Sequence, residues 1–219
     1  MKKARNVQTH SPDRREALRR VQIDKVPIGQ PYFRYMIEMV PFLEKSPEWQ
    51  EAVNSPYFKK LFEGPDDVQR VQGLIATKLV RKLRDETIRQ LIGSGDPFWL
   101  ELAIRVVRIE HKWHQSGRIQ TSALRSLARR LSAPELPDEE RRKLSKTINA
   151  ALLNKIDTGA GEEFRALAGI ARRVATSDLI AGLEQRAGNS DKSSVRINAE
   201  RMLDYINGKP YRRYLDSPL

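Results

Sequence analysis

Cysteine is absent from the 219-residue chain, which excludes disulfide bonds, cysteine-ligated zinc and thiol catalysis. Aromatic residues make up only 7% of it, and no apolar run approaches the roughly 18 residues that a membrane-spanning helix needs. The basic segment Met1–Arg5 is not followed by the apolar core of a secretory signal peptide. We therefore expect a cytoplasmic protein with no membrane partner.

A sustained alternation of apolar and polar residues is also missing, so the sequence predicts no β-strand. Proline instead follows a short polar residue at four places, an arrangement that suits the start of a helix. These places are Ser11-Pro12, Ser46-Pro47, Ser55-Pro56 and Asp96-Pro97. We predict an all-α fold, arranged either as an irregular multi-helix bundle or as a short helical solenoid.

Apolar residues at spacings of three and four define the expected helices. The longest is expected to run from Pro65 to about Ile92, and a helix from Pro31 to about Val40 is expected to be stopped by Pro41. The others are expected over Pro12–Val21, Pro97–His114, Thr121–Leu131, Pro137–Ile156, Phe164–Val174, Leu179–Leu183 and from Ser194 to a cap at Asn207-Gly208.

The turn Thr158–Gly161 is the best candidate for a boundary between subdomains. It separates a helical core domain, residues 21–157, from a C-terminal helical subdomain, residues 162–208. Residues 1–20 are expected to form a basic arm and the first helix, and residues 209–219 a tail.

Positive charge dominates the composition. Forty Lys and Arg against 28 Asp and Glu give a formal charge of +12 at pH 7. Such an excess attracts polyanions, and nucleic acid is the commonest of these. The same positive charge would also attract a membrane surface or an acidic protein.

The excess is concentrated in two segments, residues 1–20 with a net charge of +5 and residues 105–130 with a net charge of +6. Because solubility does not require such crowding, the distribution favours contacts with phosphate groups. The candidate contacts are Arg105, Arg108, Lys112, Arg118, Arg125, Arg129 and Arg130 in the second segment and Lys2, Lys3, Arg5, Arg14 and Arg15 in the first.

Helical spacing sharpens the second segment. Arg105, Arg108 and Lys112 are expected to share one helix face, and Arg125 and Arg129 repeat the arrangement one helix later. If the two helices lie side by side, they form a basic ridge that a polyanion would stabilise. The alternative is a solvated face that is balanced by acids from elsewhere in the fold. The N-terminal arm likewise fits a phosphate-binding tail or an ordinary terminus.

Other kinds of site have little support. His111 and His114 lie one helical turn apart beside Glu110, but Arg108 and Lys112 would repel a metal ion there. No phosphate-binding loop, nucleophile motif or pair of acids marks a catalytic site. We expect no metal site, no cofactor and no enzymatic activity.

Two further patterns bear on nucleic acid. Residues 121–153 fit a helix-turn-helix motif poorly, because the connection Ser132–Pro137 is long and carries two prolines. Aromatic side chains that could stack on bases lie beside arginines at Tyr32–Tyr35 and Tyr211–Tyr214. The first group is more typical of a core, and the second fits either a stacking role or docking on the domain.

The segment from Val195 to Pro210 has a distinctive order of residues. An arginine, an Ala-Glu pair and a Leu-Asp pair precede Gly208-Lys209-Pro210. This order resembles a helix of phage small-terminase-like and related mobile-element proteins, and the resemblance covers under a tenth of the chain. It implies a DNA-handling protein of phage or plasmid origin.

These patterns together predict a non-enzymatic protein that binds DNA or RNA through phosphate contacts, alone or with other subunits of a nucleoprotein complex. The alternative is a helical adaptor or scaffold whose basic face binds an acidic protein.

Overall fold

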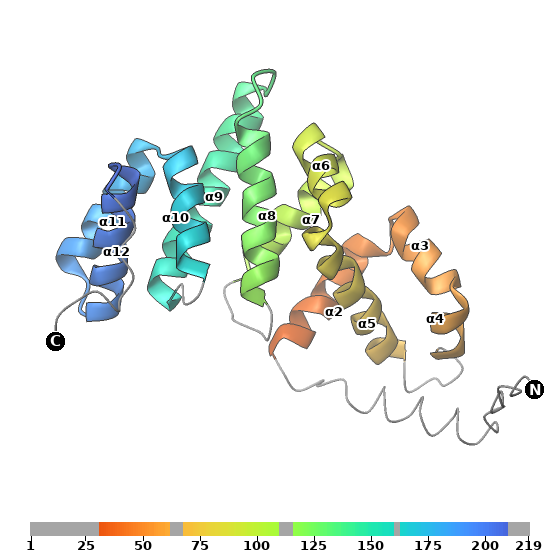
Figure 1. The fold of residues 1–219 in the computed structure, drawn as a ribbon. Coiled ribbons are helices and arrows are strands. Elements are labelled where there is room, and N and C mark those ends of the chain that lie inside the picture. Colours follow the sequence, from red (N-terminus) through yellow and green to blue (C-terminus); the bar gives the residue numbers. More distant parts are fainter. Residues whose placement is uncertain (1–30, 62–67, 110–115, 160–162, 210–219) are drawn as a thin grey trace, which may run out of the picture. The chain divides into compact units, whose positions relative to one another are not determined.

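The structure is a computed structural model that describes residues 31–61, 68–109, 116–159 and 163–209. Within these ranges it contains eleven α-helices, one short 3₁₀ helix and no strand, which confirms the all-α prediction (Figure 1). The chain divides into two compact units, Met1–Leu79 and Val80–Leu219, at a point inside one of the helices.

The first unit contains α2 (Pro31–Leu43), α3 (Pro47–Asn54), α4 (Pro56–Leu61) and most of α5 (Val68–Arg81). The proline-based starts of α3 and α4 are confirmed, and the Ser46 hydroxyl accepts a hydrogen bond of 3.1 Å from the amide of Trp49. Phe33 of α2 is 3% exposed and packs against Gly73 of α5.

The prediction that Pro41 ends its helix is wrong, because α2 continues through it to Leu43. A proline removes one amide donor from a helix and crowds the preceding turn. Here the cost is confined to the last turn. The amide of Glu44 still donates to the carbonyl of Val40 at 2.9 Å.

The prediction of one helix from Pro65 to Ile92 is also wrong. Three elements occupy its described part: α5, the 3₁₀ helix η2 (Lys82–Arg84) and α6 (Glu86–Ser94). The backbone of Asp85 is extended and ends the helical run. A tertiary contact stabilises this break, since the Ser122 hydroxyl donates to the carbonyl of Leu83 at 2.8 Å.

Besides η2 and α6, the second unit contains α7 (Pro97–Val107), α8 (Ser116–Leu131), α9 (Asp138–Thr158), α10 (Phe164–Val174), α11 (Ser177–Asn189) and α12 (Ser193–Ile206). The unit is built around α8, which contacts α6, α7, α9 and α10 (Figure 1). Its longest helix is α9, with 21 residues.

Helix α7 ends at Val107, so the predicted end near His114 is wrong. The buried side chain of Gln120 stabilises the end, because its amide donates to the carbonyls of Val106 at 3.2 Å and Ile109 at 2.8 Å. Its oxygen accepts a hydrogen bond from the buried Lys155. The helix therefore ends where a side chain from α8 satisfies its last carbonyls.

Helices α10 and α12 contact α9 within the second unit, and α10 also contacts α8. Arg186 of α11 binds both carboxylate oxygens of Asp157 of α9, at 2.7 and 2.8 Å. The hydrogen bond raises the pKa of Arg186 further above its usual value, although burial opposes this shift. The division of the chain lies between Leu79 and Val80, and the subdomain boundary expected at Thr158–Gly161 stays a prediction.

Predictions for the C-terminal helices have mixed outcomes. Helix α10 has the predicted bounds, whereas α11 is longer than the predicted piece Leu179–Leu183 because it continues to Asn189. Gly208 ends α12 with a φ of 86°, as the Asn207-Gly208 pair predicts. No helix in the described part of the chain combines the length and apolar character that crossing a membrane requires.

Candidate functional site

Helix α8 is buried on most sides and exposes arginines. Between Ile119 and Arg129, every residue is buried except Arg125 and Arg129. Arg118, the residue before Ile119, is also exposed. The spacing of seven and four residues places all three arginines on one face of the helix. The neighbouring helices cover most of the rest of α8, so it meets solvent mainly through Arg118, Arg125 and Arg129, which we name the arginine stripe.

Helix α10 presents a similar stripe. Its buried residues are apolar, whereas Arg165, Gly169, Arg172 and Arg173 are exposed. Arg165, Gly169 and Arg173 follow one another at intervals of four, so they share a face. No neighbouring heavy atom lies within 4 Å of the position that a Cβ atom on Gly169 would take. The middle of the stripe is therefore open.

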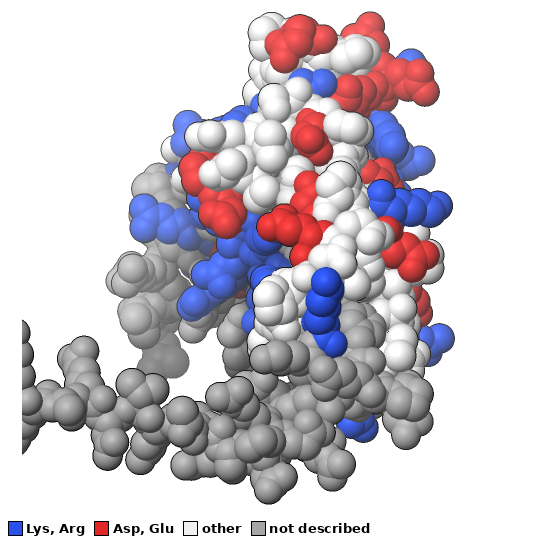
Figure 2. Space-filling model, turned by 90° about the vertical axis from the view of Figure 1, so that its right-hand side faces the viewer, with Lys and Arg blue, Asp and Glu red and all other residues white. Residues whose placement is uncertain are grey.

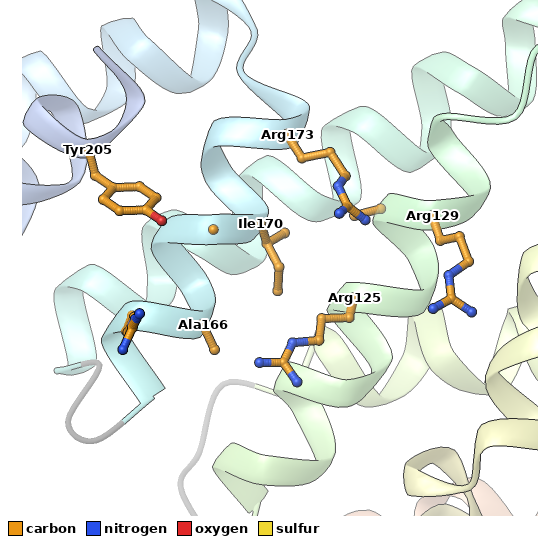
Figure 3. A pocket seen from close by; sticks show the side chains of 9 residues that line it. Arg125, Arg129, Ala166, Ile170, Arg173 and Tyr205 are labelled. Carbon is orange, nitrogen blue, oxygen red and sulfur yellow. The ribbon is translucent and has the colours of Figure 1, made fainter. Parts of the chain in front are cut away.

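The two stripes border one pocket of 570 Å³, which we name the α8–α10 groove (Figure 3). In Figure 3, Arg125 extends from α8 towards α10, Arg173 extends from α10 towards α8, and Ile170 lies between them. Tyr205 of α12 adds an aromatic ring to the lining. The groove is lined by Arg125, Ala128, Arg129, Arg165, Ala166, Gly169, Ile170, Arg173 and Tyr205.

The electrostatic character of the α8–α10 groove is one-sided, since four arginines and no carboxylate line it. Arg129 forms an ion pair of 3.4 Å with Glu86 of α6 and points away from α10 in Figure 3. Arg125, Arg165 and Arg173 form no ion pair with any residue that the structure describes. Like charges that line one pocket repel one another, so a bound polyanion would stabilise these arginines.

Figure 2 shows a group of acidic side chains at the top of the view, the level at which Figure 1 shows the turn between α8 and α9. Other acidic side chains lie among basic ones over the rest of this face. The turn between α8 and α9 and the first turn of α9 carry the exposed Glu135, Asp138 and Glu139. Helix α9 has Asp138, Glu139 and Glu140 in its first turn, where negative charge suits the helix dipole, and none of them lines the α8–α10 groove.

The structure divides the predicted basic cluster. Arg105 forms an ion pair of 2.9 Å with Glu101 on its own helix, and Arg108 donates to the Thr147 hydroxyl of α9 at 3.2 Å. Neither lines the α8–α10 groove with Arg125 and Arg129. The other predicted contacts, which lie outside the described residues, are Lys112 and the arm residues Lys2, Lys3, Arg5, Arg14 and Arg15.

No family model, curated protein or solved structure matches this chain. The predicted histidine pair, His111 and His114, lies outside the described residues. Among the residues that are described, no group of three His, Cys, Asp or Glu side chains could hold a metal ion.

Arg165 and Arg173 belong to the groove but were not among the predicted contacts. A net charge summed along the sequence hides them, because acids on other faces and neighbouring segments cancel their charge. The spacing of Arg165, Gly169 and Arg173 was the signal that could have identified them. It places both arginines on the exposed face of α10, away from its apolar residues.

Arg130 has a structural role according to its contacts. Its side chain is 12% exposed and forms ion pairs with Glu140 at 3.1 Å and Glu135 at 3.6 Å. Replacing it with glutamine is expected to cost about 1–3 kcal/mol in the free energy of unfolding, because Glu140 loses its bidentate partner. The affinity for nucleic acid that the sequence predicts should change less than about twofold.

Urea unfolding and fluorescence anisotropy with labelled oligonucleotides measure these two quantities. Arg129→Gln serves as the comparison, because Arg129 is 53% exposed and lines the groove. It should alter unfolding by less than about 0.5 kcal/mol while weakening binding. A large loss of affinity in Arg130→Gln with unchanged stability would contradict this assignment.

Proposed function

We propose that this protein is a non-enzymatic nucleic-acid-binding protein whose α8–α10 groove holds the phosphate backbone. The observation that carries the proposal is that four arginines from two packed helices, three of them without an ion pair among the described residues, line a groove that no carboxylate lines. Phosphate oxygens are the acceptors that guanidinium groups match best, by geometry as well as charge.

The lining of the groove supports a polymer rather than a membrane surface as the polyanion. Arg125 and Arg173 border a concave pocket of 570 Å³, whereas a lipid surface would be met by a flat or convex face. Ala166 is half-buried and, with the largely buried Ala128 and Ile170, gives the lining a small apolar part against which a sugar can pack. The recognition expected from this lining is largely electrostatic, with little sequence readout.

The proposal is tested by measuring binding to labelled single- and double-stranded DNA and RNA at several salt concentrations. The double variant Arg125→Gln/Arg173→Gln should bind about tenfold more weakly, and its dependence on log salt should be shallower by about two units. The matched control is Arg142→Gln/Lys192→Gln, which removes the same charge from two exposed residues outside the groove. It should change affinity by less than about threefold.

Equal effects of the two double variants would overturn the assignment of the groove. Absence of salt-sensitive binding to all four nucleic acids would overturn the function. Binding that is no tighter than to heparin would favour an acidic protein as the partner.

The basic lining of the α8–α10 groove is compatible with the resemblance noted at residues 195–210. In the structure α12 and the Gly208 turn occupy residues 193–208, and Tyr205 of α12 lines the groove. A DNA-handling role in a phage or plasmid would place the α8–α10 groove on DNA. Preference for DNA over RNA in the assay supports that narrower proposal.

A further inference from the structure

A second basic pocket lies between the end of α7 and the middle of α9. Its volume is 440 Å³, and we name it the α7–α9 pocket. Three cationic side chains line it, namely Arg108, Lys143 and Lys146. The other polar lining residues are Thr147 and Asn154, and the remaining ones are small or apolar. No carboxylate is among its lining residues.

The cations of the α7–α9 pocket are available to a ligand. Lys143 and Lys146 are exposed, and neither they nor Arg108 forms an ion pair within residues 31–61, 68–109, 116–159 and 163–209. The hydrogen bond from Arg108 to the buried Thr147 hydroxyl fixes one edge of the guanidinium, and its other donors have no partner among the residues that the structure describes. The arginine is therefore held in place before a ligand binds.

The pocket is extended along α9, which indicates the shape of its ligand. Its lining on this helix runs from Lys143 to Asn154, a distance of roughly 16 Å at about 1.5 Å per residue. A single small anion would occupy one end of such a surface. The three cations lie in the first half of this lining, since Arg108 bonds to Thr147. Successive phosphates of one strand advance by about 3.4 Å each along a duplex axis, so a strand held by these cations can continue along Ala150, Ala151 and Asn154.

The α7–α9 pocket and the α8–α10 groove are separate. They share no lining residue, and different pairs of helices build them. Both belong to the second unit, in which α8 and α9 pack together. The two sites therefore belong to the same compact unit.

We propose that the α7–α9 pocket is a second binding site for a phosphodiester chain, so that one molecule holds two segments of nucleic acid together. This inference rests on the proposed function of the α8–α10 groove. It adds that the protein bridges strands as a monomer, whereas a protein with one site would need to dimerise to do so.

Bridging is measured by coupling a short oligonucleotide to beads and asking whether the full-length protein captures a second, labelled oligonucleotide. Three double variants are compared with the wild type: Lys143→Glu/Lys146→Glu in the pocket, Arg125→Glu/Arg173→Glu in the groove, and Arg142→Glu/Lys192→Glu outside both. Light scattering gives the oligomeric state, and circular dichroism confirms the helical content. Glutamine versions of the same pairs repeat the test with a smaller change in charge.

The wild type should capture the second oligonucleotide, and so should the variant altered outside both sites. The pocket variant and the groove variant should each still bind one oligonucleotide but should lose at least about tenfold in bridging. Unchanged bridging by the pocket variant would overturn the inference. Bridging by a dimer would also overturn the inference if altering either site left bridging unchanged, because a dimer carries two copies of the unaltered site.

The failure of the proposed function gives a different result, since no variant and no wild-type protein would then bind even one oligonucleotide. Titration with inorganic phosphate or a mononucleotide at constant ionic strength tests whether the α7–α9 pocket binds a small phosphate compound instead of a polymer. Saturable binding of either one in the α7–α9 pocket, with no bridging, would overturn the polymer as its ligand.

Discussion

Replacing Gly169 with glutamate is expected to lower the affinity for nucleic acid about 100-fold while leaving the fold at least as stable. Gly169 lies in the middle of the stripe on α10, between Arg165 and Arg173, and lines the α8–α10 groove. A carboxylate about 6 Å from a phosphate repels it by about 3 kcal/mol at an effective dielectric constant of about 20. A free-energy loss of this size corresponds to about 100-fold in affinity.

The substitution separates binding from folding because Gly169 is a helical glycine with open space around it. No heavy atom lies within 4 Å of the position of its Cβ atom. Glutamate favours a helix interior over glycine by about 0.5–1 kcal/mol. It would also stand four residues before Arg173, which is the favourable order for a helical ion pair. A loss of binding therefore cannot be attributed to unfolding.

The chain offers a matched control at Gly188, a second exposed helical glycine, in α11, whose Cβ position is equally open. Gly188→Glu makes the same change in charge but lies outside both pockets. It should weaken binding less than about threefold, and Gly169→Ala should have a similarly small effect. Affinities come from anisotropy titrations and stabilities from urea unfolding. Equal losses for Gly169→Glu and Gly188→Glu would remove the groove as the site.

Replacing Gly73 with valine is expected to destabilise the first unit by about 3 kcal/mol. A Cβ atom on Gly73 would overlap the ring of Phe33, which is 3% exposed and leaves little room for the ring to move. Overpacking of a buried site costs about 1–3 kcal/mol, and valine adds two methyl groups beyond the Cβ atom. The glycine is thus required by the close approach of α2 and α5.

Hydrogen exchange in peptides from α2 and α5 localises this effect to the first unit. The same substitution at Gly188, where a Cβ atom meets nothing, should change the exchange of α11 little. Phe33→Leu combined with Gly73→Val should recover part of the lost protection, because the smaller side chain relieves the overlap. Protection of α2 and α5 that is unaffected by Gly73→Val would contradict the packing of Phe33 on Gly73.

Several helix ends followed from local chemistry. The prolines after Ser46, Ser55 and Asp96 each begin a helix, as predicted, because capping and a missing amide act within one turn. Gly208 likewise ends α12 with a left-handed backbone. These signals depend on a few adjacent residues, so the sequence contains them in full.

Other ends depended on residues far along the chain. The break at Asp85 is stabilised by Ser122, and the end of α7 by Gln120, each from α8. Local periodicity continues across the first of these points, and it predicted one helix where the structure has three elements. A hydrogen bond between segments separated by 14 or 39 residues leaves no local pattern.

The candidate site shows the same division. Spacing alone indicated that Arg125 and Arg129 share a helix face, and both line the α8–α10 groove. It did not indicate that Arg130, the next residue, turns inward to Glu140. Nor did it indicate that Arg108 lies with Lys143 in another pocket.

The sequence by itself determined the helical class, the excess of positive charge and the faces on which individual arginines lie, because these depend on composition and on a fixed helical period. Tertiary structure decided which faces meet. The packing of α8 against α10 places Arg125 in one groove with Arg165 and Arg173, which lie outside the two segments where the sequence concentrates its positive charge. An electrostatic site depends on distances through space, and helix packing sets those distances for residues 40 or more positions apart.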